Sequence, residues 1–316
     1  MNLEKEVLLS LQYQNRNIWL NFNYRSYKNA HLTQTIFFSN TYFAIHKVNL
    51  IGKKMELLIN DLEIHISGNT RNPAMIFVHG FPYDHTMWNK QVQYFDNDFF
   101  CITYDIRGLG ASKVGDGQFT MEKFAEDLFS IIEELKLKKP ILCGLSMGGY
   151  LAFRAIEINQ DVFKSVIFCD TKSQSDSDEI KLRRANKIKQ INKVGLDAFV
   201  EEFVPTCFSD NYKLNFTEKY NEIKFLCKTN NPIGVKGALL AMISRTDSTS
   251  FLSKIKIPSL LLCGEFDTLT PPALMEDIAS KIPNSKFLVV PNSGHMSPIE
   301  NPDFVNNAIE TFLQSN

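Results

Sequence analysis

The sequence lacks the features that mark membrane, nucleic-acid and metal-binding proteins. It contains no run of about 18 apolar residues, so it predicts no transmembrane helix. Its formal net charge is only −1, which gives no electrostatic reason to expect nucleic acid or an anionic membrane as a partner. Its six cysteines never form a Cys-x-x-Cys pair, which argues against a zinc site and against a disulfide framework. A neutral small molecule is therefore the expected partner.

The first residues do not predict a secretory signal peptide. Glu4, Lys5 and Glu6 stand where a signal peptide would need an uninterrupted apolar stretch. Three cysteines, Cys143, Cys169 and Cys263, lie in or at the end of apolar runs, as small buried hydrophobic residues do. These observations predict a protein of the reducing cytoplasm.

The composition predicts one large globular domain preceded by an unusual segment. Of the 316 residues 44% are hydrophobic and 22% are charged. Residues 1–54 contain a single glycine and show no sustained period of 2 or 3.6, so we expect an extension of doubtful order there. One hypothesis is that translation begins at Met55, and the alternative is an ordinary N-terminal arm. Two β-like runs then meet at Asn60-Asp61, which predicts a hairpin.

The domain at 55–316 shows short apolar strands that alternate with helical patterns. Thr120 stands at the start of one such helix, which places Phe124, Leu128 and Ile131 on one face. This alternation predicts an α/β fold with a mostly parallel sheet that is covered on both faces. The strands are expected at 74–78, 100–104, 141–143, 165–169, 259–263 and 286–290.

The alternation stops between Asp170 and about Thr246, where the sequence predicts helices and no convincing strand. We expect a helical cap at about 171–246, inserted between two strands, of the kind that covers an active site. Its segment 179–193 carries six cationic side chains and one acidic side chain. We interpret it as a helix whose charged face is solvated and whose Leu182, Ala185 and Ile188 turn inward, because no aromatic residues interleave with the charges.

The run Pro140-Ile-Leu-Cys-Gly-Leu-Ser-Met-Gly-Gly-Tyr150 is typical of a nucleophilic serine. Here an apolar strand ends in Gly-x-Ser-x-Gly and passes directly into a helix. A sharp strand-to-helix turn lifts the hydroxyl of Ser146, and it needs small neighbours such as Gly144 and Gly148 because the backbone is crowded there. We therefore predict Ser146 as the nucleophile.

A serine hydroxyl needs a base, and the usual base is a histidine that a carboxylate orients. Of the six histidines only His295 follows Ser146, and it lies in a turn-rich loop directly after a strand. Nine aspartates lie between the two residues. Asp267 directly follows the 259–263 strand and is favoured as the acid, whereas Asp170, after the 165–169 strand, is the alternative.

Attack on a carbonyl group requires backbone N–H groups for the oxygen that becomes negative. We expect these donors at Met147, directly after the serine, and at Phe81, where Gly80 permits close approach. Phe81, Met147 and Trp88 are candidates for the wall of the acyl pocket, with plain core packing as the alternative.

Several motifs together carry a family resemblance. They are His79-Gly-Phe-Pro82, Asp105-x-Arg-Gly-x-Gly-x-Ser112, Gly144-x-Ser-x-Gly-Gly149, Gly264-x-x-Asp-x-x-Thr-Pro271 and Gly294-His295. Over residues 55–316 the chain resembles the α/β-hydrolase fold family, and most of all its branch related to 3-oxoadipate enol-lactonase and carboxylesterases. The resemblance implies Ser146 as nucleophile, Asp267 as acid and His295 as base, with no metal and no organic cofactor. Residues 1–54 match nothing in that family.

The sequence therefore predicts a serine hydrolase that cleaves a small ester, thioester or lactone through an acyl-enzyme. The resemblance also implies that Ser146 argues against an epoxide hydrolase or a haloalkane dehalogenase. Enzymes of this fold with those activities carry aspartate at the corresponding turn. Two alternatives remain open. One is a C–C bond hydrolase or cofactor-free perhydrolase with the same triad, and the other is a ligand-binding or signalling protein with slow turnover.

Overall fold

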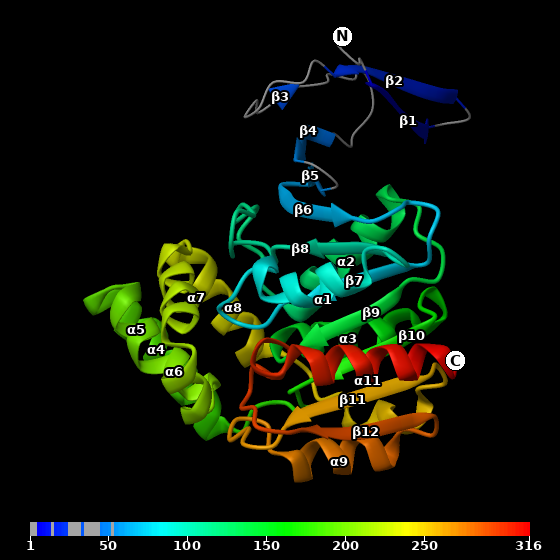
Figure 1. The fold of residues 1–316 in the computed structure, drawn as a ribbon. Helices are drawn as coiled ribbons and strands as arrows, with labels where there is room; N and C mark the ends of the chain where they lie inside the picture. Colours follow the sequence, from blue (N-terminus) through cyan, green and yellow to red (C-terminus); the bar gives the residue numbers. More distant parts are fainter. Residues whose placement is uncertain (1–4, 14–15, 25–32, 35–44, 52–53) are drawn as a thin grey trace.

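A twisted sheet with helices on both faces forms the body of the protein in the computed structural model (Figure 1). The structure describes residues 5–13, 16–24, 33–34, 45–51 and 54–316, with side chains from Met55 onward. The strand order in the main sheet is β12-β11-β10-β9-β7-β8-β6-β5-β4-β3. Pairing is parallel from β12 to β8 and antiparallel from β8 to β3. The predicted mostly parallel α/β sheet is confirmed.

The strands of the parallel part are short and buried, because helices cover both of their faces. Every residue of the five strands from β7 to β11 is buried. Each predicted strand is present, with ends that shift by at most two residues. Their bounds are Ala74–Val78 for β7, Phe100–Tyr104 for β8, Ile141–Leu145 for β9, Ser165–Cys169 for β10, Ser259–Gly264 for β11 and Ser285–Val290 for β12.

The predicted hairpin is confirmed. Strands β5 (Lys54–Ile59) and β6 (Leu62–Ser67) pair in antiparallel fashion. Asn60 and Asp61 both have positive φ values, 50° and 66°, as the tight turn of a two-residue hairpin requires.

The predicted N-terminal extension at 1–54 lies partly outside the described residues. The structure describes the strands β1 (Lys5–Tyr13) and β2 (Arg16–Tyr24), which pair with each other, and β3 (Thr33–Gln34) and β4 (Ile45–Ile51), which continue the main sheet. A start of translation at Met55 stays a prediction, and the intact mass of natively expressed protein tests it.

Helices cover the sheet on both faces (Figure 1). Helices α1 (Asn89–Phe95) and α11 (Pro302–Gln314) contact each other in front of the sheet, and α2 (Met121–Glu134) and α3 (Met147–Asn159) pack together behind it. Helix α2 begins as predicted, because the side chain of Thr120 accepts a hydrogen bond from the amide of Lys123. Helix α9 (Pro272–Lys281) contacts β11 and β12, and α10 (Ser297–Glu300) is a single turn before α11.

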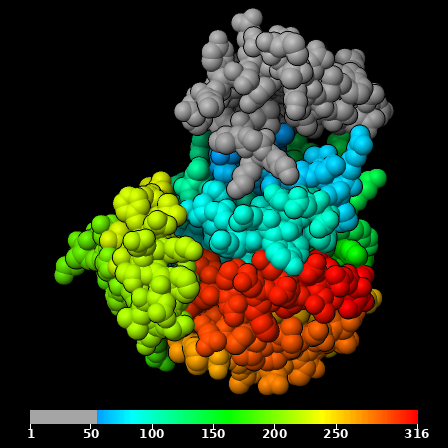
Figure 2. Space-filling view, in the orientation of Figure 1, coloured from blue at the N-terminus to red at the C-terminus, as the bar shows by residue number. Residues whose placement is uncertain are grey.

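The segment between β10 and β11 forms the helical cap and contains no strand, as predicted. Its α-helices are α4 (Asp178–Val194), α5 (Leu196–Phe203), α6 (Asp210–Asn215), α7 (Thr217–Thr229) and α8 (Pro232–Ser244). In the space-filling view these residues form a lobe beside the body, next to the red C-terminal segment (Figure 2). The cap lies at the end of the sheet where β9, β10 and β11 finish (Figure 1).

One detail of the cap was predicted wrongly. Leu182 in α4 is 66% exposed, although the sequence pattern predicted that its side chain turns inward. Ile191 is the buried residue of this helix, and Ile188 is half-buried. Helix α4 lies on the outer surface of the cap and packs mainly against α5 and α8, so only a narrow stripe of it is covered. Among the described residues, no helix is long and apolar enough to cross a membrane.

Candidate active site

Ser146 occupies the sharp turn between β9 and α3. Its backbone angles are φ 53° and ψ −111°, a conformation that a non-glycine residue adopts only where the surrounding structure enforces it. The flanking glycines make this turn possible. A Cβ on Gly144 would lie 2.5 Å from the carbonyl oxygen of Gly148, and a Cβ on Gly148 would lie 2.3 Å from that of Val78. The half-buried Ser146 side chain stands at the carboxyl end of the sheet.

The structure brings Ser146, His295 and Asp267 into one chain of hydrogen bonds. The Nε2 atom of His295 lies 2.8 Å from Oγ of Ser146, and its Nδ1 atom lies 2.8 Å from Oδ2 of Asp267. The three residues come from three different strand ends, those of β9, β11 and β12. In this arrangement Nδ1 donates its proton to Asp267, which leaves Nε2 free to accept the proton of the serine hydroxyl.

Asp267 is held in place by donors from its own loop. Its Oδ1 atom accepts hydrogen bonds from the amides of Leu269 at 2.8 Å and Thr270 at 3.0 Å. Its Oδ2 atom accepts from Oγ1 of Thr270 at 2.6 Å. These bonds leave the carboxylate one orientation, in which Oδ2 faces the imidazole of His295.

The opposite charges of His295 and Asp267 shift the pKa values of both side chains. Burial lowers the pKa of His295, but the neighbouring Asp267 carboxylate outweighs burial and holds that pKa above its usual value. Burial likewise raises the pKa of Asp267, and the charge and hydrogen bond of His295 outweigh it, so that the pKa of Asp267 lies below its usual value. The pair therefore favours an ionised aspartate and stabilises the imidazolium that forms when the serine loses its proton.

Asp170, the alternative acid, is engaged elsewhere. Its Oδ1 atom accepts a hydrogen bond from the amide of Gly264 at 2.7 Å, and its Oδ2 atom accepts from Oγ of Ser297 at 2.5 Å. Burial, reinforced by the nearby Asp267 carboxylate, raises the pKa of Asp170 well above its usual value. Two adjacent carboxyl groups do not both ionise readily, so the neutral form of Asp170 leaves Asp267 as the charged partner of the histidine.

Two backbone amides near Ser146 were predicted as oxyanion donors, those of Met147 and Phe81. Met147 is the first residue of α3, where helical N–H groups lack partners within the helix. The amide of Phe81 belongs to the turn that follows β7, and within residues 54–316 no backbone acceptor is paired with it. A Cβ on Gly80 would lie 3.5 Å from Cβ of Ser146, so this turn closely approaches the serine. The role of these two amides as oxyanion donors stays a prediction.

His79 fixes the turn that carries Phe81. Its Nδ1 atom lies 2.8 Å from the carbonyl oxygen of Gly80, and its Nε2 atom accepts a hydrogen bond from the amide of Ile106 at 2.9 Å. Both ring nitrogens are therefore used when the imidazole is neutral. Burial lowers the pKa of His79, which preserves this neutral form. The sequence motif contained His79, but its role was not predicted.

Aromatic side chains of the cap pack directly on this turn. The ring of Phe81 lies 5.8 Å from that of Phe199 and 5.7 Å from that of Phe203, measured between ring centroids. Phe199 and Phe203 stack on each other at 5.4 Å within α5. The neighbourhood of the serine on the cap side is therefore apolar.

Among the described residues, Trp88 makes no hydrogen bond to the serine, the histidine or the aspartate. It is fully buried in η1 (His85–Trp88), where its ring lies 5.3 Å from that of Phe77 in β7. These contacts favour the core-packing alternative over a place in the pocket wall.

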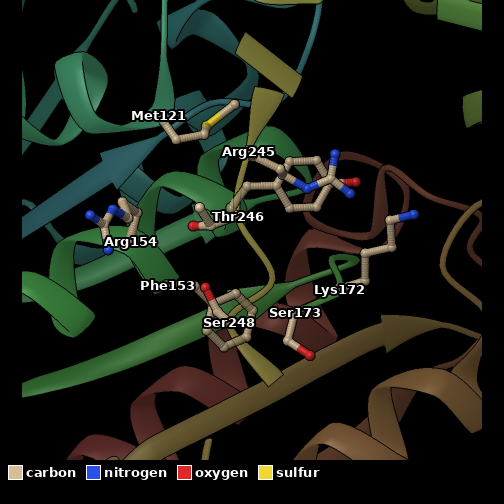
Figure 3. A pocket seen from close by; sticks show the side chains of 9 residues that line it. Met121, Phe153, Arg154, Lys172, Ser173, Arg245, Thr246 and Ser248 are labelled. Atoms are coloured by element: carbon tan, nitrogen blue, oxygen red, sulfur yellow. The ribbon is translucent and has the colours of Figure 1, made fainter. Parts of the chain in front are cut away.

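A separate small pocket lies where the two ends of the cap meet the body (Figure 3). Arg245, which lies in it, is buried and stacks over the ring of Tyr150 at 4.1 Å. Its guanidinium donates to Asp176 at 2.8 Å, and Arg184 also binds Asp176, at 2.6 Å. Asp176 thus pairs with both arginines, and the Arg245–Asp176 pair joins the two ends of the cap. The lining residues are Met121, Tyr150, Phe153, Arg154, Lys172, Ser173, Arg245, Thr246 and Ser248.

Two clusters of metal-ligating side chains occur among the described residues, and protein donors bind the carboxylates in both. In the first, Asp105 accepts hydrogen bonds from the amide and ring of His85 and from the amide of Ala111, each at 2.8 Å. In the second, the Cys263 thiol donates to the carbonyl oxygen of Thr270 at 3.1 Å, and burial raises the pKa of this thiol. The clusters are His65, His85 and Asp105, and Asp170, Cys263 and Asp267.

The chain matches one family model, described as the alpha/beta hydrolase fold, over residues 73–223 and 192–302. A 3-oxoadipate enol-lactonase from Acinetobacter baylyi is 28% identical over 274 residues, which cover 86% of this chain and 98% of that protein.

Two solved structures support the same assignment. A thermophilic esterase from Thermogutta terrifontis superposes with a TM-score of 0.77 at 33% identity, covering 91% of this chain and 99% of the esterase. An enol-lactonase from Burkholderia xenovorans superposes with a TM-score of 0.75 at 25% identity, covering 82% and 99% of the two chains.

Proposed function

The chain belongs to the α/β-hydrolase fold family, and we propose that within this family it is a serine hydrolase that cleaves a small ester, thioester or lactone. The observation that carries the proposal is the hydrogen-bonded chain from Ser146 through His295 to Asp267, with 2.8 Å at both of its imidazole contacts. The similarity to an esterase and to enol-lactonases supports carboxylic ester chemistry.

The first half of the proposed reaction forms an acyl-enzyme. His295 removes the proton from Ser146 through Nε2 while Oγ attacks the carbonyl carbon of the substrate. The amides of Phe81 and Met147 donate hydrogen bonds to the oxyanion of the tetrahedral intermediate. The imidazolium, which Asp267 stabilises, then returns its proton to the departing alcohol, thiol or enol.

The second half releases the acid. Water enters the site of the departed group, and Nε2 of His295 takes a proton from it as its oxygen attacks the acyl carbon. The same two amides stabilise the second tetrahedral intermediate, and Ser146 leaves with the proton held by the imidazole. For a lactone, both products are parts of a single hydroxy acid or oxo acid.

The surroundings of the serine favour an uncharged substrate of modest size. The Phe81, Phe199 and Phe203 rings pack on one another, and they offer a substrate apolar surface instead of charge. Removal of apolar substrate surface from water would supply the binding free energy there. All six cysteines are free and buried, in keeping with our proposal of a cytoplasmic protein.

Hydrolysis assays with a matched pair of serine variants test this function. The panel contains short p-nitrophenyl esters, acyl thioesters, lactones and a vinylogous diketone. Ser146→Ala should lower kcat/KM by about 10³-fold or more, because the nucleophile is lost. Ser165→Ala is the control, because Ser165 is buried and its Oγ atom has no hydrogen-bond partner among the described residues.

Each class of substrate gives a distinct answer. Ester or lactone turnover that disappears in the Ser146 variant and persists in the Ser165 variant supports the proposal. Turnover confined to the diketone would replace it with C–C bond hydrolysis. A well-folded wild-type protein without activity on any class would contradict it.

A further inference from the structure

The carboxylate of Glu300 lies between the loop that carries His295 and the cap. Its Oε1 atom accepts hydrogen bonds from the amides of Gly294 at 3.0 Å and Met296 at 3.3 Å. Its Oε2 atom accepts from the amide of Ser209 at 3.0 Å. One side chain therefore binds the backbone on both sides of the histidine and a residue that is far away in the sequence.

The two amides that Oε1 binds belong to the residues on either side of His295. The imidazole has to keep one nitrogen toward Ser146 and the other toward Asp267, and each of these distances is 2.8 Å. A shift of the backbone at this point would move both nitrogens together. A misplacement of about 1 Å in such a site costs about 100-fold in rate.

The amide that Oε2 binds belongs to the cap. Ser209 is buried and stands at the start of α6, where its own side chain accepts a hydrogen bond from the amide of Tyr212. The cap and the histidine loop are in close contact here, because a Cβ on Gly294 would lie 2.7 Å from the backbone nitrogen of Ser209. In Figure 2 the cap lobe adjoins the red C-terminal segment.

We propose that Glu300 is a positioning residue, whose carboxylate couples the seating of the cap at Ser209 to the placement of the His295 imidazole. This inference rests on the proposed function, because it assigns His295 the role of base. It makes the cap part of the catalytic geometry in addition to its role as a cover. A cap displaced at Ser209 would release one oxygen of Glu300 and loosen the loop that the other oxygen holds.

The charge of Glu300 also acts on the pKa of His295, which can be measured separately from kcat. The groups facing His295 are the carboxyls of Asp267, Asp170 and Glu300, and a negative charge on Glu300 raises the pKa of the imidazole. Asp170 favours its neutral form through burial, which raises its pKa. Glu300 and Asp267 are therefore the carboxylates whose charges act on the histidine.

Besides His295, three titratable side chains interact with Glu300, and all three are neutral near pH 7. Burial raises the pKa of Cys207 to about 12 and that of Tyr83 well above its usual value. Burial also raises the pKa of Tyr212 to about 12. Burial raises the pKa of Glu300 as well, while the hydrogen bonds from the Ser209, Gly294 and Met296 amides oppose this shift.

Glu300→Gln removes the charge and one of the two links. The amide oxygen can still accept from the histidine loop, but the NH₂ group then meets the amide of Ser209 as donor against donor. We expect kcat to fall about 10-fold because the cap link is lost. The acid limb of the pH profile of kcat/KM should move to lower pH by about half a unit, because the imidazolium loses a stabilising negative charge.

Glu300→Asp separates geometry from charge. It keeps the negative charge, but its side chain is one methylene shorter and cannot reach both the loop and the cap. We expect a fall in kcat similar to that of the glutamine variant and a smaller shift of the acid limb. Glu265→Gln is the matched control, because the exposed Glu265 accepts one hydrogen bond among the described residues, from the amide of Asn292 at 3.0 Å in the same loop. It should leave kcat within about twofold and the pH profile unchanged.

An NMR titration of the His295 imidazole in these variants keeps the test independent of turnover. A lower His295 pKa in Glu300→Gln than in wild type supports the coupling, even if the wild-type protein hydrolyses nothing and the proposed function fails. An unchanged His295 pKa and a kcat within twofold of wild type would overturn it. Equal effects of the Glu265 and Glu300 variants would also overturn it, because they would show only general support of the loop.

Discussion

Replacement of Asp267 by asparagine is expected to abolish most of the activity while leaving the shape of the site intact. The two oxygens of the carboxylate have different partners. Oδ1 accepts from two backbone amides, those of Leu269 and Thr270, so this position has to remain an oxygen in the variant. The NH₂ group of the asparagine must then take the place of Oδ2, which lies 2.8 Å from Nδ1 of His295.

That NH₂ group donates to Nδ1 and forces the proton of the neutral imidazole onto Nε2. Nε2 lies 2.8 Å from Oγ of Ser146, and once protonated it can no longer accept the serine proton. The loss of the imidazolium partner adds to this effect. We expect kcat to fall by about 10⁴-fold, which corresponds to about 5 kcal/mol in the activation free energy.

Steady-state hydrolysis of a p-nitrophenyl ester measures the effect, and urea unfolding verifies that the variant is folded. Asp170→Asn is the matched control. It replaces a second carboxyl close to His295, which already favours its neutral form because burial raises its pKa, with a neutral amide. It should cost less than about 10-fold, because Asp170 bonds to Gly264 and Ser297 and lacks a bond to the imidazole. If Asp267→Asn kept activity within 10-fold and Asp170→Asn lost most of it, the assignment of the acid would be refuted.

Two further predictions concern stability. The hydrogen bond and charge of His85 outweigh burial and lower the pKa of Asp105 from 3.8 to about 2. Because the folded-state value is the lower one, Asp105 contributes about 2.5 kcal/mol above pH 4, and this contribution is lost as the pH falls toward 2. Asp105→Asn should remove this contribution at pH 7, so that the free energy of unfolding from urea titrations falls less steeply between pH 4 and pH 2 than in wild type. Curves of variant and wild type that run parallel over this range would contradict the prediction. Arg245→Met should lower the free energy of unfolding by about 3 kcal/mol, because Asp176 stays buried with one partner fewer. A loss below 1 kcal/mol in the same titrations would mean that this pair is dispensable.

The body of the fold was predictable because its signals are local. Five strands are buried on both faces, so each appears in the sequence as a continuous apolar run. Asn60 and Asp61 tolerate positive φ, and Thr120 caps a helix with its own side chain, so the hairpin and α2 are visible from a few neighbouring residues.

The cap was predictable only as a class of structure. Its helices were expected, but the burial of Leu182 was wrong, because α4 packs along a narrow stripe that includes Ile191. Which face of a helix is buried depends on the helices that pack against it. For α4 these are α5 and α8, whose placement the sequence of α4 does not indicate.

In the candidate site, the chain order of Ser146, Asp267 and His295 could be read from the motifs, and the structure places these side chains within hydrogen-bonding distance of one another. The supporting residues could not be found in this way. Thr270 holds Asp267 in place, and Glu300 supports the histidine loop by bonding to the backbone amide of Ser209 in the cap. Almost every residue has a backbone amide, so the residue type at the donor position does not indicate which side chain accepts from it.

The central claim is that Ser146 is a nucleophile activated by His295, and mass spectrometry after reaction with a fluorophosphonate probe tests it most directly. We predict a single covalent adduct on the peptide that contains Ser146, absent from Ser146→Ala and formed far more slowly in His295→Ala. A folded wild-type protein that stays unlabelled, or that carries the adduct on another serine, would contradict the claim.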